Sequence, residues 1–297
     1  MKLFRERVTP VENIAFMAIM AAFVAIISLI GALLPLSSIF IMVLVPLAAS
    51  AVALFCKARY LPIFFLGCFG LAMAVSAWNF AGTVFYVLPS LLTGLCYGLL
   101  WKVKAPSSIN IFATSILGFL LFLLSLRLAG WMAGVDMQVF LLSLIKKENS
   151  ESAPIVFPLF CFAYSVAQIG IAHIFLTYEL AHVGKRENGE GKFGPFHPLV
   201  SAGFSILSAI CVLFSLKTAY FFLGCGLFWA VFSLTSLHPK THWATWVTLG
   251  VGVFVSLMLF AAFFKRIDGF GGMLLLLVPI AFFDLSSFLN FLLLRKA

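Results

Sequence analysis

Ten runs of apolar residues dominate the chain, and each approaches the length of a membrane-spanning helix. Crossing a bilayer takes about 20 apolar residues in succession. Only 10% of the 297 residues are charged and 63% are hydrophobic, whereas soluble domains average about 25% charged and about 45–50% apolar residues. This composition excludes a water-soluble fold, a disordered chain and a disulfide-stapled secreted domain. It predicts an all-α, polytopic membrane protein of about ten spans that form a single transmembrane domain over residues 1–297. The runs are 14–34, 38–56, 60–78, 84–101, 108–133, 154–178, 198–216, 219–236, 243–264 and 271–294.

Basic residues are distributed unevenly over the connections, as expected if both termini lie in the cytoplasm. Lys and Arg accumulate in cytoplasmic loops because they are hard to translocate. With the N-terminus inside, the inner segments hold 13 basic residues, namely Lys2, Arg5, Arg7, Lys57, Arg59, Lys102, Lys104, Lys185, Arg186, Lys192, Lys240, Arg295 and Lys296. The outer segments hold five, namely Lys146, Lys147, Lys217, Lys265 and Arg266. The formal net charge of +9 therefore reflects topology, and no nucleic-acid partner is predicted. This frame requires a break at Lys217–Tyr220, which divides one long apolar stretch into two spans.

Two connections are longer than the others. The outer one contains an amphipathic segment, 136–147, in which Asp136 is a good N-cap residue and the apolar residues that follow recur at helical spacing. These residues are Met137, Phe140, Leu141, Leu144 and Ile145, and Lys146 and Lys147 close the segment. We interpret it as an interfacial connector or as a lid over a cavity open to the outside. The cytoplasmic loop 184–198 is polar and rich in glycine, and is expected to be a solvated linker or a contact for a cytoplasmic partner.

The sequence contains no motif that indicates catalysis. It has no Gly-x-x-x-x-Gly-Lys-Ser/Thr loop for ATP phosphates, no His-Glu-x-x-His zinc motif and no Gly-x-Ser-x-Gly nucleophile elbow. The six cysteines are scattered singly without a Cys-x-x-Cys pair, and His238 and His242 are four residues apart within a short inner loop. We therefore predict no enzymatic activity, no catalytic residue, no metal site and no cofactor.

Ionisable groups inside a span are costly unless they are paired or hydrated, which makes them candidates for function. Arg127 lies in the fifth run and Asp284 near the middle of the last. One interpretation is that Arg127 extends outward past Trp131 while Asp284 is protonated or hydrogen-bonded to a neighbour. The other is that both face the interior, paired directly or through a ligand. Tyr164 and Gln168, four residues apart in the sixth run, either bond between helices or add to a polar binding cavity with these two.

The first run carries a stripe of small residues, Ala15, Ala18, Ala22 and Ala25. The spacing Ala18-x-x-x-Ala22 is a small-xxx-small pattern, which lets another helix backbone approach closely. The stripe predicts either close packing inside the bundle of this chain or a docking face for another subunit.

The opening sequence from Asn13 to Ala25, followed by Pro35 and a second helix that ends at Lys57–Arg59, resembles the start of substrate-binding (S) components of energy-coupling-factor transporters. Those proteins carry an Ala-x-x-x-Ala motif in the first helix that contacts the transmembrane coupling subunit, and Ala18 and Ala22 match it. An S component typically has six spans, so the last four of the ten counted here lack a counterpart.

The full length is similar to the YybS-like family of uncharacterised membrane proteins, which is thought to be distantly related to S components. The similarity includes the long outer loop after the fifth span and the Gly-rich eighth run Phe222–Trp229. It also includes a last helix with Asp284 followed by Arg295 near the end.

This resemblance implies a multi-pass protein of the cell (cytoplasmic) membrane that binds a small-molecule substrate for uptake. A separate transmembrane coupling subunit and ABC-type ATPases would energise it. Two other hypotheses stay open. The chain is a self-sufficient secondary transporter with Asp284 as its ion or proton site, or a non-transporting scaffold for other membrane proteins.

Overall fold

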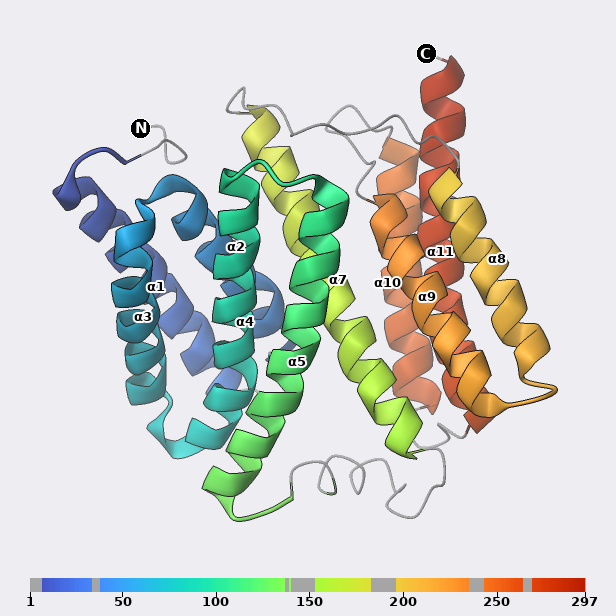
Figure 1. Ribbon diagram of the computed structural model, residues 1–297, viewed down its shortest axis with the longest axis horizontal. Coiled ribbons are helices and arrows are strands. Elements are labelled where there is room, and N and C mark those ends of the chain that lie inside the picture. Colours follow the sequence, from blue (N-terminus) through green and yellow to red (C-terminus); the bar gives the residue numbers. More distant parts are fainter. Residues whose placement is uncertain are drawn as a thin grey trace. The chain divides into compact units, whose positions relative to one another are not determined.

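In the computed structural model, which describes residues 7–33, 38–136, 139, 153–182, 196–234, 243–263 and 269–296, every apolar run forms an α-helix (Figure 1). The helices are α1 (Pro10–Leu33), α2 (Ser38–Phe55), α3 (Leu61–Val75), α4 (Phe80–Lys102), α5 (Ser107–Ala133), α7 (Ala153–His182), α8 (Phe196–Cys211), α9 (Leu216–Leu234), α10 (Trp243–Phe263) and α11 (Gly269–Lys296). Two 3-10 turns, η2 (Ala58–Tyr60) and η3 (Ala77–Asn79), precede α3 and α4. The described ranges contain no strand, which confirms the all-α fold class.

Six helices are long and apolar enough to cross a membrane. They are Pro10–Leu33, Ala58–Val75, Ala77–Lys102, Ile109–Ala133, Leu216–Ser233 and Leu276–Leu293. Four further apolar stretches are shorter, namely Leu44–Phe55, Tyr164–Thr177, Phe196–Cys211 and Trp243–Ser256. Helix α8, for example, has 16 residues and rises only about 24 Å at 1.5 Å per residue. Six helices of this length and composition indicate a polytopic membrane protein.

The break between α8 and α9 lies earlier than predicted. Val212–Phe214 form a turn, and α9 begins at Leu216, so Lys217 and Tyr220 are helical rather than part of the break. The backbone N–H of Ala219 bonds to the carbonyl oxygen of Ser215 at 3.0 Å, which starts the α9 ladder one turn before the predicted position. The predicted break began at Lys217, but one exposed lysine fits readily into the first turn of a helix.

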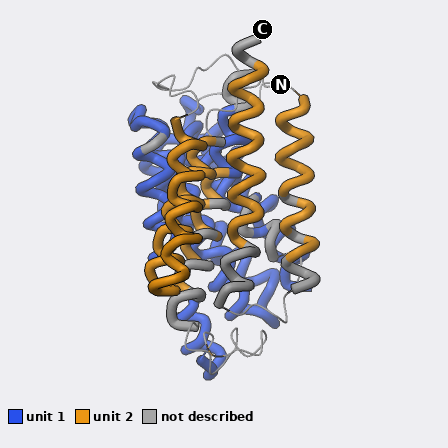
Figure 2. The backbone as a smooth tube through the Cα atoms, turned by 90° about the vertical axis from the view of Figure 1, so that its right-hand side faces the viewer, with its two compact units in different colours: residues 1–138, 171–189 blue, residues 139–170, 190–297 orange. Residues whose placement is uncertain are grey.

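The chain folds into two compact units (Figure 2). Unit 1 comprises residues 1–138 and 171–189, and unit 2 comprises 139–170 and 190–297. Helix α7 contributes its first half to unit 2 and its second half to unit 1. The expectation of a single transmembrane domain over 1–297 stays a prediction. Most of the amphipathic segment 136–147 and of the loop 184–198 lies outside the described residues.

Unit 1 begins with a reciprocal cap on α1. The backbone N–H of Glu12 donates to Thr9 Oγ1, while Glu12 Oε2 accepts from the backbone N–H groups of Thr9 and Val8, each at 3.2 Å. This is a capping box, and Pro10 occupies the first helical position, where a missing N–H costs nothing. The cap fixes the residue at which α1 starts.

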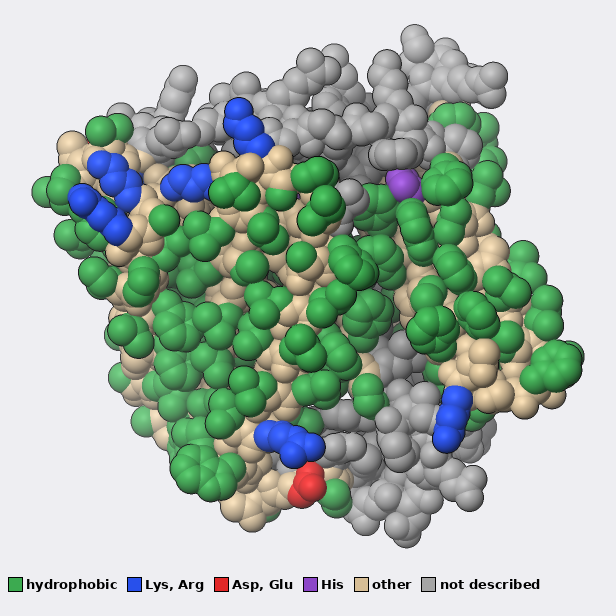
Figure 3. All heavy atoms as spheres, viewed as in Figure 1, with side chains coloured by type: hydrophobic (Ala, Val, Ile, Leu, Met, Phe, Trp, Pro, Cys, Tyr) green, Lys and Arg blue, Asp and Glu red, His purple; other side chains and the backbone are tan. Residues whose placement is uncertain are grey.

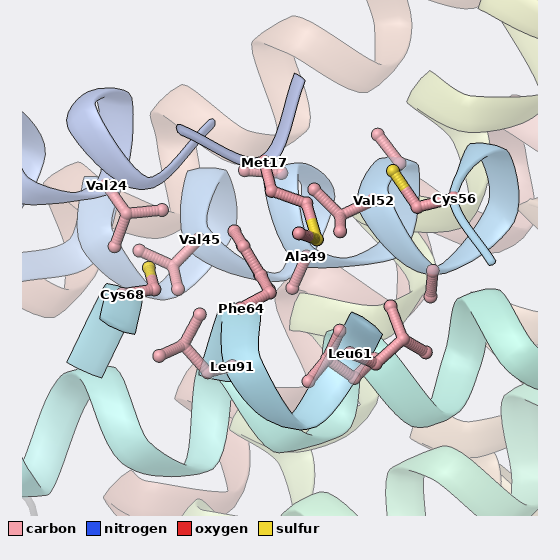
Figure 4. Close-up of a cluster of buried hydrophobic side chains, with 14 of the residues drawn as sticks. Met17, Val24, Val45, Ala49, Val52, Cys56, Leu61, Phe64, Cys68 and Leu91 are labelled. Carbon is pink, nitrogen blue, oxygen red and sulfur yellow. The ribbon is translucent and has the colours of Figure 1, made fainter. Parts of the chain in front are cut away.

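The core of unit 1 lies among α1, α2, α3 and α4. Met17 and Val24 of α1 meet residues of α2 and α3 there, as Figure 4 shows. The backbones of α2 and α4 approach each other closely. A Cβ added at Gly94 would lie 2.5 Å from the carbonyl oxygen of Pro46, and one added at Gly98 would lie 2.5 Å from that of Ser50. The two backbones are therefore in direct contact, which only glycine permits.

Unit 2 packs α8 against α9, α9 against α11 and α10 against α11. Its apolar core is formed by Val166 of α7, residues of α9 and Ile280 of α11. Two hydrogen bonds tie neighbouring helices together inside this apolar packing. Ser208 Oγ donates to the carbonyl oxygen of Ala219 at 2.7 Å, and the Ser233 and Ser287 hydroxyls lie 2.7 Å apart.

Candidate functional site

The alanine stripe of α1 is mostly exposed. Ala15, Ala18 and Ala22 lie on the exposed side of the helix, whereas Ala25 is buried at 6% exposure. The side of α1 that packs inside unit 1 is a different one, formed by Phe16, Met17, Val24 and Ile27. Three of the four predicted docking residues are thus available at the surface, and Ala25 is used within unit 1.

Large apolar side chains run beside the exposed alanines. Ile19, Phe23, Ile26 and Ile30 follow each other at helical spacing and are 42–64% exposed. A row of alanines next to a row of branched and aromatic side chains forms a groove and a ridge, the surface relief by which helices interlock. This side of α1 can therefore accept another helix at close range.

Asp284 of α11 contacts a residue that the sequence did not single out. One oxygen of its half-buried carboxyl is hydrogen-bonded with the hydroxyl of Ser201 in α8. The other, Oδ1, is shielded from solvent and has no hydrogen-bond partner among the described residues. The Ser201 hydroxyl itself donates to the carbonyl oxygen of Gly226 in α9 at 2.9 Å. Asp284 therefore belongs to a small polar group formed by three helices of unit 2.

This arrangement has a chemical consequence for the carboxyl. A hydroxyl has one proton to donate, and both the Asp284 carboxyl and the Gly226 carbonyl lie within reach of Ser201. Ser201 can therefore donate to an Asp284 carboxylate, or accept from a protonated carboxyl while its own proton goes to Gly226. The group is suited to holding and releasing a proton at one carboxyl oxygen.

The remaining predicted ligand residues lie on two other helices. Gln168 is buried and Tyr164 half-buried in the first half of α7, within unit 2. Among the described residues of that unit, neither is hydrogen-bonded to the Asp284 carboxyl. Arg127 is exposed on α5 of unit 1, four residues before Trp131, which is 83% exposed. An exposed arginine near a helix end reaches the membrane surface by extending its stem along apolar residues.

Sequence reasoning missed an aromatic cluster in unit 1. The Tyr97 hydroxyl of α4 lies 2.5 Å from Nδ1 of His173 in α7, and both side chains are fully buried. Trp101 packs against the His173 ring with centroids 5.4 Å apart, and Nδ2 of Asn110 in α5 donates to the carbonyl oxygen of Tyr97 at 3.2 Å. His173 was visible as a polar residue in an apolar run, but no spacing links it to Tyr97, which lies 76 positions away.

No protein-family model, curated protein or solved structure matches this chain.

Proposed function

We propose that this chain is an S-component-like membrane subunit that binds a small molecule for uptake and docks a separate coupling subunit through α1. The proposal takes the chain as a cell-membrane protein of about ten spans with both termini in the cytoplasm. The observation that carries it is the exposure of Ala15, Ala18 and Ala22 on the side of α1 opposite its packed face.

Contact with lipid alone gives no advantage to a row of exposed alanines. Toward lipid tails, a small side chain gains nothing over leucine, whereas toward another helix it permits close backbone contact and more van der Waals attraction. The chain has no ATP-binding loop, so separate ATPases would have to supply the energy.

The test is a leucine substitution on the groove. Ala18→Leu together with Ala22→Leu should abolish co-purification of the coupling subunit and its ATPases from native membranes, because the two added side chains fill the groove. Helical content and thermal unfolding should stay unchanged, since both positions are exposed. The matched control is Ile19→Leu with Ile26→Leu, which keeps the size of the neighbouring ridge (64% and 58% exposed) and should retain the partners.

The identity of the co-purified proteins separates the hypotheses. ATPase subunits that depend on Ala18 and Ala22 support the proposal. Isolation of the chain alone favours a secondary transporter, and recovery of unrelated membrane enzymes favours a scaffold. Partners retained by the double variant would contradict docking through α1.

A secondary transporter is the second candidate, because Asp284 has the surroundings of a proton site. Its oxygen Oδ1 is sealed from solvent, and the Ser201 hydroxyl can bond with the carboxyl whether or not the carboxyl carries a proton. Asp284→Asn retains a donor toward Ser201 but cannot release a proton, so it should abolish proton-coupled uptake in reconstituted vesicles. Asp136→Asn, at an exposed carboxylate after α5, is the control and should transport normally. Full activity of Asp284→Asn would reject this candidate.

A further inference from the structure

Five basic residues gather at one end of unit 1, and we call this set the basic end. They come from segments far apart in the chain, which the antiparallel packing of α1, α2, α3 and α4 brings to the same end. Figure 3 shows Lys and Arg side chains gathered there. The set is Arg7, Lys57, Arg59, Lys102 and Lys104.

Two of the five cations contact other groups of unit 1. The Arg7 guanidinium lies over the Phe16 ring at 4.0 Å. Lys102 Nζ donates to the carbonyl oxygen of Cys56, just past the end of α2. Cations are favourable at this position because the last carbonyls of a helix carry partial negative charge. The Lys102 contact joins the end of α4 to the end of α2, and Arg7 also lies 5.9 Å from the Phe55 ring of α2.

The remaining cations are exposed to solvent. Arg59 donates to the hydroxyl of its neighbour Tyr60 at 2.6 Å. The ammonium groups of Lys57 and Lys104 make no hydrogen bond or ion pair with any residue that the structure describes. Lys57 follows α2, and Lys104 lies in the connection from α4 to α5.

Among the side chains that the structure describes, the basic end has one carboxylate against its five cations. Of the carboxylates in unit 1 whose side chains are described, Glu12 is committed to the cap of α1. Asp136 follows α5 and so lies at the opposite end of the antiparallel α4–α5 pair. The described residues of this end therefore carry a net positive charge.

The position of the basic end at the ends of the apolar helices indicates which molecules it can contact. It lies at the termini of membrane-length apolar helices, beside Tyr60 and Trp101, which are half-buried. Tyrosine and tryptophan favour the headgroup layer, where lipid phosphates are found. We propose that the basic end binds the phosphate of anionic phospholipid headgroups, with Lys57 and Lys104 as the principal contacts. Clustered Lys and Arg next to a span attract anionic lipid in this way.

The test compares two lipids of matched acyl chains, phosphatidylglycerol and phosphatidylcholine, titrated onto the full chain in neutral detergent and counted by native mass spectrometry. Each cation of a basic cluster at the membrane surface contributes about fivefold to the attraction of anionic lipid. Lys57→Gln with Lys104→Gln should therefore lower the preference for phosphatidylglycerol by about 25-fold. The matched control removes two exposed cations elsewhere, Arg127→Gln with Lys217→Gln, and should keep the preference.

Two further measurements complete the test. Raising the salt concentration from 0.1 M to 1 M shortens the screening length from about 10 Å to about 3 Å, and should abolish the preference of the unmodified chain whether or not the variants fold. Glycerol 3-phosphate should fail to displace the lipid at millimolar concentration. Equal binding of both lipids, a preference insensitive to salt, equal losses in both double variants, or displacement by glycerol 3-phosphate would overturn the proposal.

Discussion

The side-chain oxygen of Asn13 in α1 accepts a hydrogen bond from the backbone N–H of Lys57 at 2.9 Å. The amide nitrogen of the same side chain donates to the carbonyl oxygens of Thr9 at 2.7 Å and Arg7 at 3.2 Å. Asn13 is completely buried. One side chain therefore joins the start of α1 to the turn after α2, which are 44 positions apart.

Replacing Asn13 by leucine should destabilise unit 1 by about 1–3 kcal/mol, because buried polar groups lose their partners. The thermal unfolding midpoint in detergent, followed by circular dichroism, measures the effect. Ile14→Leu is the control, since Ile14 is 57% exposed and should unfold at the original temperature. An Asn13→Leu midpoint within error of that control would show that the bridge contributes no stability.

Gly98→Ala should destabilise the α2–α4 contact by about 1–3 kcal/mol, the range for overpacking a filled interface. The new Cβ would lie 2.7 Å from Cβ of Ala53 and 2.5 Å from a backbone oxygen, so a backbone has to shift. Gly70→Ala is the matched control, because a Cβ there meets nothing within 4 Å. It should be neutral or stabilising by up to about 1 kcal/mol, since alanine is the better helix former. Unfolding midpoints that move equally in both variants would contradict the close contact.

Tyr97→Phe should cost about 1–3 kcal/mol, because Nδ1 of the buried His173 loses the tyrosine hydroxyl. The pair is best measured as a double-mutant cycle with His173→Leu, in which the two effects should be non-additive by about 0.5 kcal/mol or more. Strict additivity would mean that the two groups do not interact in the membrane.

Thr9→Ala should weaken the start of α1 by about 1 kcal/mol, the usual cost of losing an N-cap oxygen. Thr9→Ser keeps the hydroxyl that accepts from Glu12 and should stay close to the original stability. Hydrogen exchange of the first turn of α1 would report the difference. Equal exchange in the two variants would exclude a role for the capping box.

The apolar runs predicted the helices well because a membrane span is encoded by consecutive residues. Two further features have recognisable sequence patterns that the sequence analysis did not use. They are the Thr9–Glu12 capping box and the spacing Gly94-x-x-x-Gly98 at the α2–α4 contact.

The hydrogen-bond partner of Asp284 could not be predicted from the sequence. Unit 2 contains many serines, and only the packing of α8 against α11 selects Ser201. The same holds for Tyr97 and His173, whose pairing depends on how α4 and α7 meet.

The backbone contact at Gly94 and Gly98 also determines how unit 1 can change shape. At these two positions no side chain separates α2 from α4, so sliding one helix along the other would press Cβ atoms against the facing backbone. Helices α2 and α4 are therefore expected to move together. A ligand-driven rearrangement inside unit 1 is then expected to come from α1, α3, α5 or the second half of α7 moving against this pair.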